Sequence, residues 1–294
     1  MRDVNIVDVP LLPSERQGYP AAPDLSARRK GLTDAVAAGL FTVERPPENA
    51  ALGGVRSLHF RAPGTPRGTI LHLHGGGFRI GSPEMVGAFA AAFAARCGVD
   101  VICPAYRLAP EYPFPSALAD ARAVFTALQR DSENPLILSG DSAGGGLVAG
   151  LAALAAADMR PPIGLVMLSP WLDLTVTAPA YEANVAADPM FSRGAAEEAA
   201  ALYLQGVSAR DVLASPLFGN VAGFPPSFIS VGEGEVLADD GRRFHAALTA
   251  AGVRSVLSVI AGMAHVAVTR DLALPGAAET FAAMADFVGG LIGD

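Results

Sequence analysis

A serine between two glycines is the residue in this sequence best suited to do chemistry. Residues 140–144 read GDSAG, which fits the pattern G-x-S-x-G with Ser142 at its centre. The pattern follows the apolar run Pro135–Ser139 and opens an alanine-rich stretch, so a strand, a sharp turn and a helix are predicted. Such a turn is a nucleophile elbow, and the amino end of its helix stabilises negative charge that develops during attack. We therefore predict that Ser142 is a nucleophile rather than an incidental serine in a glycine-rich turn.

A run of glycines upstream of the serine predicts a site for a negatively charged oxygen. Residues 74–78 read HGGGF and follow a short apolar run. Successive glycines let main-chain N–H groups turn inward and approach a substrate oxygen, and the N–H of Ala143 completes an oxyanion hole of this kind. A phosphate-binding loop is the competing interpretation. The run lacks the Lys-Ser/Thr of a P-loop and the full glycine pattern of a dinucleotide-binding loop.

The elements around these residues alternate between short apolar runs and longer helical patterns. The apolar runs predict strands over Thr69–His74, Val99–Ala105, Pro135–Ser139, Ile163–Leu168, Ser227–Val231 and Ser255–Ile260. The helical patterns cover Glu84–Cys97, Ser116–Gln129, Ala143–Ala157, Val236–Ala251 and Ala277–Leu291. Strands that alternate with helices predict an α/β fold with a mostly parallel central sheet and helices on both faces.

Two regions interrupt this alternation and predict a helical cap. Residues 1–50 contain several prolines around one helix-like segment, Asp24–Leu40, and residues 174–224 hold the helix-like segment Ser192–Tyr203 without a strand pattern. Both regions together would enclose an apolar pocket beside the carboxyl ends of the strands, where open α/β sheets bind ligands. We therefore divide the chain into an N-terminal cap segment (1–50), a catalytic domain (51–173 and 225–294) and a cap insertion (174–224).

The composition is that of a large globular domain and disfavours two classes of partner. The chain has 294 residues, of which 51% are hydrophobic and 17% charged, and its net charge of −8 disfavours nucleic acid or an anionic membrane as a partner. The longest apolar stretch, Gly144–Ala157, is shorter than the roughly 20 residues that span a bilayer. Asp3 and Asp8 interrupt the apolar run that a signal peptide needs. We expect a cytoplasmic protein without stable membrane insertion, with Cys97 and Cys103 as buried thiols.

Motifs spread over residues 65–270 resemble those of the hormone-sensitive-lipase-like esterases, also called bacterial family IV. They are residues 74–78 (HGGGF), 106–111 (YRLAPE), 140–145 (GDSAGG), 168–173 (LSPWLD) and 262–265 (GMAH), in the order of the family. The resemblance implies an α/β-hydrolase fold with a helical cap, and hydrolysis of short- to medium-chain acyl esters without metal or cofactor. It also implies that Gly76 and Gly77 supply oxyanion N–H groups, that His74 is structural, and that a homodimer would be unsurprising.

The order of residues along the chain selects one histidine as the general base. An α/β-hydrolase places its triad in the order serine, acid, histidine. Three histidines precede the serine and therefore do not fit: His59, His72 and His74. His245 lies within a predicted amphipathic helix, where a surface or cap-facing position is expected. His265 follows the last predicted strand on a loop, where a neutral imidazole can take the Ser142 proton and pass it to the leaving alcohol.

The acid of the triad is the position where this sequence departs from the family. The family commonly has an Asp-Pro-Leu motif after the seventh strand, whereas residues 231–240 read VGEGEVLADD. Glu235 stands in place of the first aspartate of that motif, 30 residues before the predicted base. A glutamate can orient an imidazole if the backbone adjusts for the extra methylene. We favour Glu235 and keep Glu233 open because it is nearer the strand end, whereas Asp239 and Asp240 fit the first turn of the next helix.

The predicted reaction is two-step acyl transfer on a small-molecule ester. Ser142 attacks the carbonyl with His265 as base, the alcohol leaves, and water then cleaves the acyl-enzyme. An amide or lactone as the substrate of the same triad is one alternative. A non-catalytic ligand receptor on the same scaffold is the other, and the presence of His265 argues against it. The natural substrate, the preferred acyl-chain length and the enantioselectivity depend on cap loops that the sequence does not place.

Two supporting features are predicted around the triad. Phe78, Met190 and Phe191 could line the acyl pocket, although aromatic and methionine side chains are also ordinary core residues. Arg107 and Asp141 could pair beneath the elbow and hold it in place.

Overall fold

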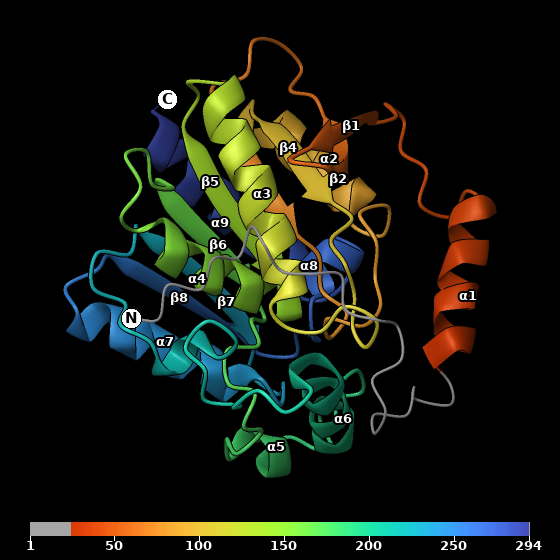
Figure 1. The fold of residues 1–294 in the computed structure, drawn as a ribbon, viewed down its shortest axis with the longest axis vertical. Helices are drawn as coiled ribbons and strands as arrows, with labels where there is room; N and C mark the ends of the chain where they lie inside the picture. The colour runs from red at the N-terminus through yellow and green to blue at the C-terminus, as the bar shows by residue number, and fades with distance from the viewer. Residues whose placement is uncertain (1–24, 294) are drawn as a thin grey trace.

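A sheet of eight strands forms the centre of the part of the chain that the structure describes, residues 25–293 (Figure 1). The structure is a computed structural model. The strands lie in the order β1-β2-β4-β3-β5-β6-β7-β8, and β2 runs antiparallel to β1 and β4 while all other neighbours are parallel. Their bounds are β1 Glu48–Leu52, β2 Val55–Phe60, β3 Thr69–Leu73, β4 Asp100–Pro104, β5 Leu136–Asp141, β6 Gly164–Leu168, β7 Ser227–Gly232 and β8 Ser255–Ile260.

The central strands are apolar along their length because helices cover both faces of the sheet. Every residue of β3, β4, β5, β6 and β7 is buried, as expected for parallel strands enclosed on both sides. The edge strands β1 and β8 contain exposed and half-buried residues instead. Ser142 and Glu235 therefore follow strands that are paired with a neighbour on both sides, whereas His265 follows the edge strand β8.

The helices between the strands separate into two layers. One apolar core lies between the sheet and α3 Ser116–Asp131, α4 Ala143–Ala155 and α7 Ala238–Ala250. The other lies between the sheet and α2 Gly87–Cys97, α8 Ala267–Arg270 and α9 Ala277–Ile292. In Figure 1, α3 and α4 lie in front of the sheet and α9 lies behind it. The mostly parallel sheet with helices on both faces, predicted from the alternating pattern, is confirmed.

Between β6 and β7 the chain leaves the sheet and forms helices. α5 Ala180–Ala183 and α6 Arg193–Leu204 lie together beyond one end of the sheet, at the bottom of Figure 1, and the short 3-10 helix η2 Pro216–Phe218 follows them. The hydroxyl of Ser192 accepts a hydrogen bond from the Ala195 N–H and so caps α6. Within residues 25–293, no helix combines the length and apolar character needed to cross a membrane.

The helix α1 Leu25–Ala37 lies to one side of the sheet, at the right of Figure 1. Its first residue, Leu25, is buried against Leu202 of α6. The guanidinium of Arg29 donates to the carbonyl oxygens of Arg79 and Ala109. Residues 1–24 of the predicted N-terminal cap segment lie outside the described residues.

The start of the sheet is the part that the sequence patterns did not predict. β1 and β2 form an antiparallel hairpin whose turn is Gly53-Gly54, with φ of 57° and 81°. Two successive residues of positive φ match the right-handed twist of paired strands and favour glycine, so this dipeptide is the sequence feature that indicates the hairpin. The boundary that we predicted between residues 50 and 51 falls inside β1.

Candidate active site

Ser142 lies on the sharp turn between β5 and α4. Its φ of 52° and ψ of −121° are unusual for a residue with a side chain, as expected for a nucleophile elbow. The turn is possible because glycines flank it: a Cβ on Gly144 would collide with the carbonyl of Leu73 on β3, and a Cβ on Gly140 would lie 2.5 Å from the carbonyl oxygen of Gly144. Close backbone packing therefore fixes the serine at the amino end of α4.

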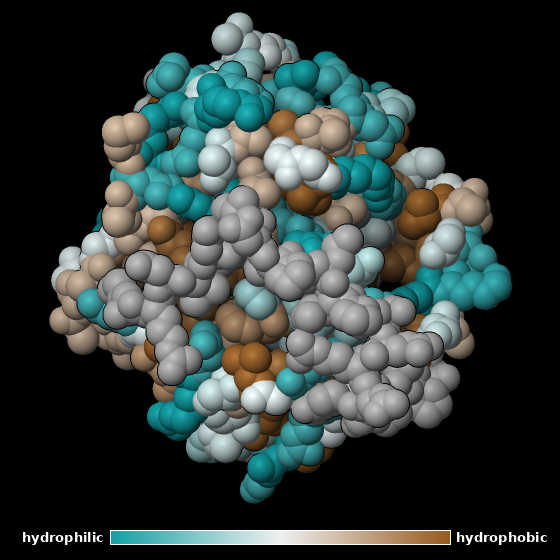
Figure 2. All heavy atoms as spheres, in the orientation of Figure 1, coloured by the Kyte–Doolittle hydropathy of each residue, from teal (hydrophilic) through white to brown (hydrophobic). Residues whose placement is uncertain are grey.

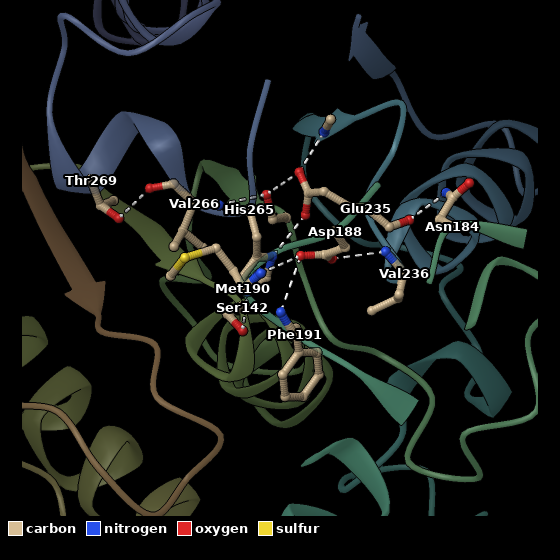
Figure 3. Close-up of polar contacts among 12 residues, drawn as sticks. Ser142, Asn184, Asp188, Met190, Phe191, Glu235, Val236, His265, Val266 and Thr269 are labelled. Carbon is tan, nitrogen blue, oxygen red and sulfur yellow. Dashed lines mark hydrogen bonds and ion pairs between the residues drawn. The ribbon is translucent and has the colours of Figure 1, made fainter. Parts of the chain in front are cut away.

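A buried histidine joins this serine to a glutamate from the neighbouring strand ends (Figure 3). His265 Nε2 lies 3.0 Å from Ser142 Oγ, and His265 Nδ1 lies 2.7 Å from Glu235 Oε2. The carboxylate can only accept, so Nδ1 carries the proton and Nε2 is free to accept from the serine hydroxyl. His265 is 6% exposed and Glu235 is 1% exposed. The three residues predicted as a triad are thus brought into one hydrogen-bonded chain.

Glu235 is held by a second set of hydrogen bonds on its other oxygen. Glu235 Oε1 accepts from Ser169 Oγ at 2.8 Å and from the main-chain N–H of Gly232. Ser169 Oγ in turn accepts from the N–H of Val266, 3.2 Å away, beside the histidine. These contacts place the longer glutamate side chain so that its other oxygen reaches the imidazole.

The other carboxylates that follow β7 lie elsewhere. Glu233 is exposed. Asp239 Oδ2 accepts from the N–H of Ala180, and Asp240 Oδ2 accepts from the N–H groups of Leu172 and Asp173. Of the competing acids, the structure therefore brings only Glu235 into contact with His265.

The environment of His265 raises its pKa above the ordinary value of 6.5. Burial alone lowers the pKa because it disfavours the charged imidazolium, but the hydrogen bond and charge of Glu235 outweigh burial, and the charges of Asp188 and Asp141 add to them. The charged form of His265 is therefore stabilised at this position.

The glycine run forms the loop between β3 and the segment that leads to α2. Gly76 and Gly77 have φ of 114° and 60°, which favour glycine. Asp141 Oδ1 accepts from the N–H of Gly75, 3.1 Å away, and so ties this loop to the elbow. Among the backbone hydrogen bonds of residues 25–293 that lie outside the helices and strands, none has the N–H of Gly76 or Gly77 as its donor. As the first residue of α4, Ala143 has an N–H without an acceptor inside the helix.

His74 has structural contacts, as the family resemblance implies. Its Nδ1 donates to the carbonyl of Gly75 at 2.7 Å, and its ring stacks on Tyr106, whose hydroxyl donates to the His74 carbonyl at 2.6 Å. Burial lowers the pKa of His74 to about 4, so the ring is neutral near pH 7. These contacts brace the start of the glycine loop.

The predicted pairing of Arg107 with Asp141 is wrong. Arg107 instead pairs with Asp120 of α3, at 2.8 Å. Asp141 points to the glycine loop and lies 3.3 Å from Nε2 of the buried His72. As the last residue of β5, Asp141 is enclosed by the neighbouring strand ends, whereas Arg107 lies on a segment that packs against α3.

Of the three predicted pocket residues, one contacts the triad. The ring of Phe191 lies over that of His265, with centroids 5.9 Å apart and planes at 11°. Phe78 is fully buried and stacks on Tyr203, so it belongs to the apolar core beneath the glycine loop. Met190 is 47% exposed.

Sequence reasoning missed the residues that support the acid. Ser169 lies in the motif LSPWLD, which was recognised without a role for its serine. Asn184 and Asp188 lie in the segment between β6 and β7, and both contact the backbone next to Glu235 (Figure 3). Only the pairing of distant segments reveals these contacts, so no local pattern could have indicated them.

This chain is similar in sequence and structure to proteins described as an acetyl-hydrolase and as esterases. Residues 70–269 match the family model described as α/β hydrolase fold. The chain is 36% identical over 225 residues to an acetyl-hydrolase of Streptomyces hygroscopicus, covering 75% of each protein. It is 33% identical over 240 residues to an esterase of Acinetobacter venetianus, covering 80% of this chain and 79% of the esterase. A crystal structure of an esterase from the bacterial hormone-sensitive lipase family superposes with a TM-score of 0.83 at 31% identity, covering 93% of this chain and 100% of that one.

This protein belongs to the α/β-hydrolase fold family, among the esterases of the hormone-sensitive lipase group. The matched region begins in β3 and ends in α8, so it includes the glycine loop, the elbow, the acid loop and the histidine. The resemblance read from the motifs is confirmed.

Proposed function

We propose that this protein is a carboxylesterase that hydrolyses short- to medium-chain acyl esters through a serine acyl-enzyme. The observation that carries the proposal is the chain of hydrogen bonds that joins Ser142, at the amino end of α4, through His265 to Glu235. The acetyl-hydrolase and the esterase to which the chain is similar support ester hydrolysis. The enzyme is thus a serine hydrolase of carboxylic esters.

The first half of the reaction forms the acyl-enzyme. His265 Nε2 takes the proton of Ser142 as Oγ attacks the ester carbonyl, and Glu235 holds the imidazole and stabilises its cation. The carbonyl oxygen becomes an oxyanion that faces main-chain N–H groups and the amino end of α4. The proposed donors are Gly76, Gly77 and Ala143.

The second half regenerates the serine. The imidazolium of His265 first gives its proton to the alcohol as that group leaves, which completes the acyl-enzyme. A water then occupies the vacated position, loses a proton to Nε2 and attacks the acyl carbon, so that its oxygen becomes part of the carboxylic acid product. The acyl–serine bond breaks, and Ser142 recovers its hydroxyl hydrogen. One base with a free Nε2 and a fixed Nδ1–H therefore serves both steps.

The regions outside the sheet form the proposed cap. We predicted the cap over residues 1–50 and 174–224; because β1 of the sheet begins at Glu48, we now assign residues 1–47 and 174–224 to the cap and residues 48–173 and 225–294 to the catalytic domain. The stacking of Phe191 on His265 supports an insertion that faces the site. Met190, beside Phe191, and Phe78, beneath the glycine loop, stay proposed pocket residues.

Two alternatives share this scaffold. An amidase or lactonase would use the same triad, and activity on an ester and an amide of the same acyl group separates these classes. A non-catalytic receptor would not react with a fluorophosphonate, whereas a serine with a hydrogen-bonded base is the target of such a probe. The intact contact between His265 and Ser142 favours the enzyme.

The proposal is tested by removing the nucleophile. Ser142→Ala should fold normally and lose hydrolysis of p-nitrophenyl acetate and butyrate. Ser132→Ala, a change in the partly exposed turn before β5, is the matched control and should keep wild-type activity. Ser142→Ala protein with most of the wild-type activity would sink the assignment.

Three further expectations belong to the same proposal. Catalysis without metal or cofactor predicts that dialysis against EDTA leaves activity unchanged. A homodimer, as the family resemblance implies, predicts twice the chain mass in light scattering. The cytoplasmic location predicted from the sequence would be checked by fractionation of expressing cells.

A further inference from the structure

The peptide group that follows Glu235 is held at both of its polar atoms by side chains from the segment between β6 and β7. Asn184 Nδ2 donates to the Glu235 carbonyl oxygen at 2.8 Å. The N–H of Val236 donates to Asp188 Oδ2 at 3.0 Å. The oxygen and the N–H belong to one planar peptide unit, so the two contacts fix its orientation and thereby the start of the Glu235 side chain (Figure 3).

The second oxygen of Asp188 shapes its own loop. Asp188 Oδ1 accepts from the N–H groups of Met190 and Phe191, at 2.9 and 3.1 Å. This local turn presents the Phe191 ring to His265, on which it stacks, and to Trp171, which it meets edge to face. Asp188 is buried, and three main-chain N–H groups compensate its carboxylate. One side chain therefore contacts the loop of the acid and the loop that covers the base.

We propose that Asp188 is a positioning residue of the triad, which couples the placement of Glu235 to the placement of Phe191 over His265. The inference rests on the proposed esterase function and adds a residue to it. Asn184 assists on the other side of the same peptide group. The cap insertion (174–224) therefore helps to hold the proposed acid and base in place, in addition to its proposed role in lining the substrate pocket.

The negative charge of Asp188 acts on the pKa of His265, which a role in packing alone would not do. The charged groups that act on His265 are Glu235 from the loop after β7, Asp188 from the insertion and Asp141 from the end of β5. All three are acidic and favour the imidazolium, so removal of one charge lowers the pKa of His265. Catalysis needs the neutral imidazole, and loss of the Asp188 charge therefore moves the acid limb of kcat/KM to lower pH.

The test is Asp188→Asn in the full chain, with p-nitrophenyl butyrate as substrate. An asparagine side chain has one accepting oxygen, whereas the Asp188 carboxylate accepts with both of its oxygens. The NH2 group of the asparagine must therefore face either the Val236 N–H or the N–H groups of Met190 and Phe191, and the N–H that it faces loses its hydrogen bond. We expect kcat to fall roughly 10- to 100-fold, as for small misplacements of a catalytic group, together with the shift of the acid limb. The matched control is Asp211→Asn, in which the same kind of local turn, Asp211 Oδ1 with the Leu213 N–H, lies within the same insertion. It should leave both quantities unchanged.

The outcomes separate this inference from the function on which it rests. The positioning role is overturned if Asp188→Asn and Asp211→Asn have the same kcat and the same acid limb of kcat/KM. It is also overturned if Asp188→Asn lowers kcat but leaves the acid limb of kcat/KM at the wild-type pH. If Asp188→Asn does not fold, Asn184→Ala carries the test: a lower kcat with an unmoved acid limb supports the clamp, and an unchanged kcat overturns it. Activity retained in Ser142→Ala would instead overturn the esterase itself, whatever Asp188 does.

Discussion

The two halves of the active site are held in place by different means. Ser142 and the glycine loop are fixed by backbone packing: Gly140 and Gly144 allow β5, α4 and β3 to approach without side chains between them. Glu235 and His265 lie on loops after β7 and β8 and are fixed by hydrogen bonds from distant side chains, chiefly Ser169 and the insertion. The proposed nucleophile is therefore positioned by backbone packing, and the proposed acid and base are positioned by polar contacts that can be removed one at a time.

The elbow around Ser142, which backbone packing holds in place, should lose both stability and activity when that packing is changed. Gly144→Ala introduces a Cβ that meets the backbone carbonyls of Leu73 and His74, neither of which can move without shifting β3. We expect a loss of folded, active protein, or a destabilisation of about 3 kcal/mol or more, measured by thermal unfolding. Gly194→Ala is the control: nothing lies within 4 Å of its Cβ in α6, so the alanine should stabilise by about 0.5–1 kcal/mol. A Gly144→Ala protein as stable as wild type would contradict the comparison.

Removal of the negative charge of Glu235 should lower kcat while the protein stays folded. Glu235→Gln keeps the size of the side chain but cannot stabilise the imidazolium or fix its tautomer. We expect kcat to fall roughly 10³- to 10⁴-fold, by analogy with the loss of the triad acid in other serine hydrolases. Glu233→Gln should change kcat little because Glu233 is exposed. A collapse of kcat in Glu233→Gln alone would transfer the role to that residue.

Removal of a supporting hydroxyl should have a smaller effect than removal of the acid. Ser169→Ala deletes the donor to Glu235 Oε1 but leaves the Gly232 N–H in place. A hydrogen bond to a charged group contributes about 1.5–3 kcal/mol, so we expect kcat to fall roughly 10- to 100-fold. Ser230→Ala removes a buried hydroxyl for which no partner lies within the described residues, and it should leave kcat unchanged. Equal kcat values for the two alanine variants would remove Ser169 from the site.

The smallest effect concerns the pH dependence of activity and stability. The raised pKa of His265 predicts that kcat/KM rises with pH through an apparent pKa above 6.5. The sign for stability is opposite: protonation of His265 stabilises the folded state, a contribution fully present below about pH 6.5 and lost as pH rises through the folded pKa. In Glu235→Gln this contribution to unfolding free energy should disappear. An acid limb centred well below 6.5 in the wild type would contradict the proposed electrostatics.

The sequence was sufficient for the elements with a strong local pattern. The buried strands and the amphipathic helices were found at nearly their observed bounds, since apolar runs and helical periodicity reflect burial directly. The glycine pattern around Ser142 and the position of His265 after the last strand located the two residues that the structure brings into hydrogen-bonding contact, the proposed nucleophile and base. β1 was missed because it is a short edge strand with little apolar pattern, and β2 because polar residues interrupt its short sequence VRSLHF. The Gly53-Gly54 turn is the feature that indicates both strands.

The choice among carboxylates was harder from the sequence. Glu235 was selected by its position in a family motif, and Glu233 stayed open because it is nearer the end of the preceding strand. The structure distinguishes them by burial and by contact with Ser169. The roles of Asn184 and Asp188 depend on how the insertion folds back over the strand ends, which is a long-range property that no short sequence pattern records.

The most direct test of the proposed chemistry is covalent labelling of the nucleophile. The protein is treated with a fluorophosphonate, and intact mass and peptide mapping locate the adduct. We predict one phosphonyl group per chain, on Ser142, and none in Ser142→Ala. An unlabelled wild-type protein, or an adduct on another residue that accompanies loss of activity, would contradict the proposal that Ser142 forms the acyl-enzyme.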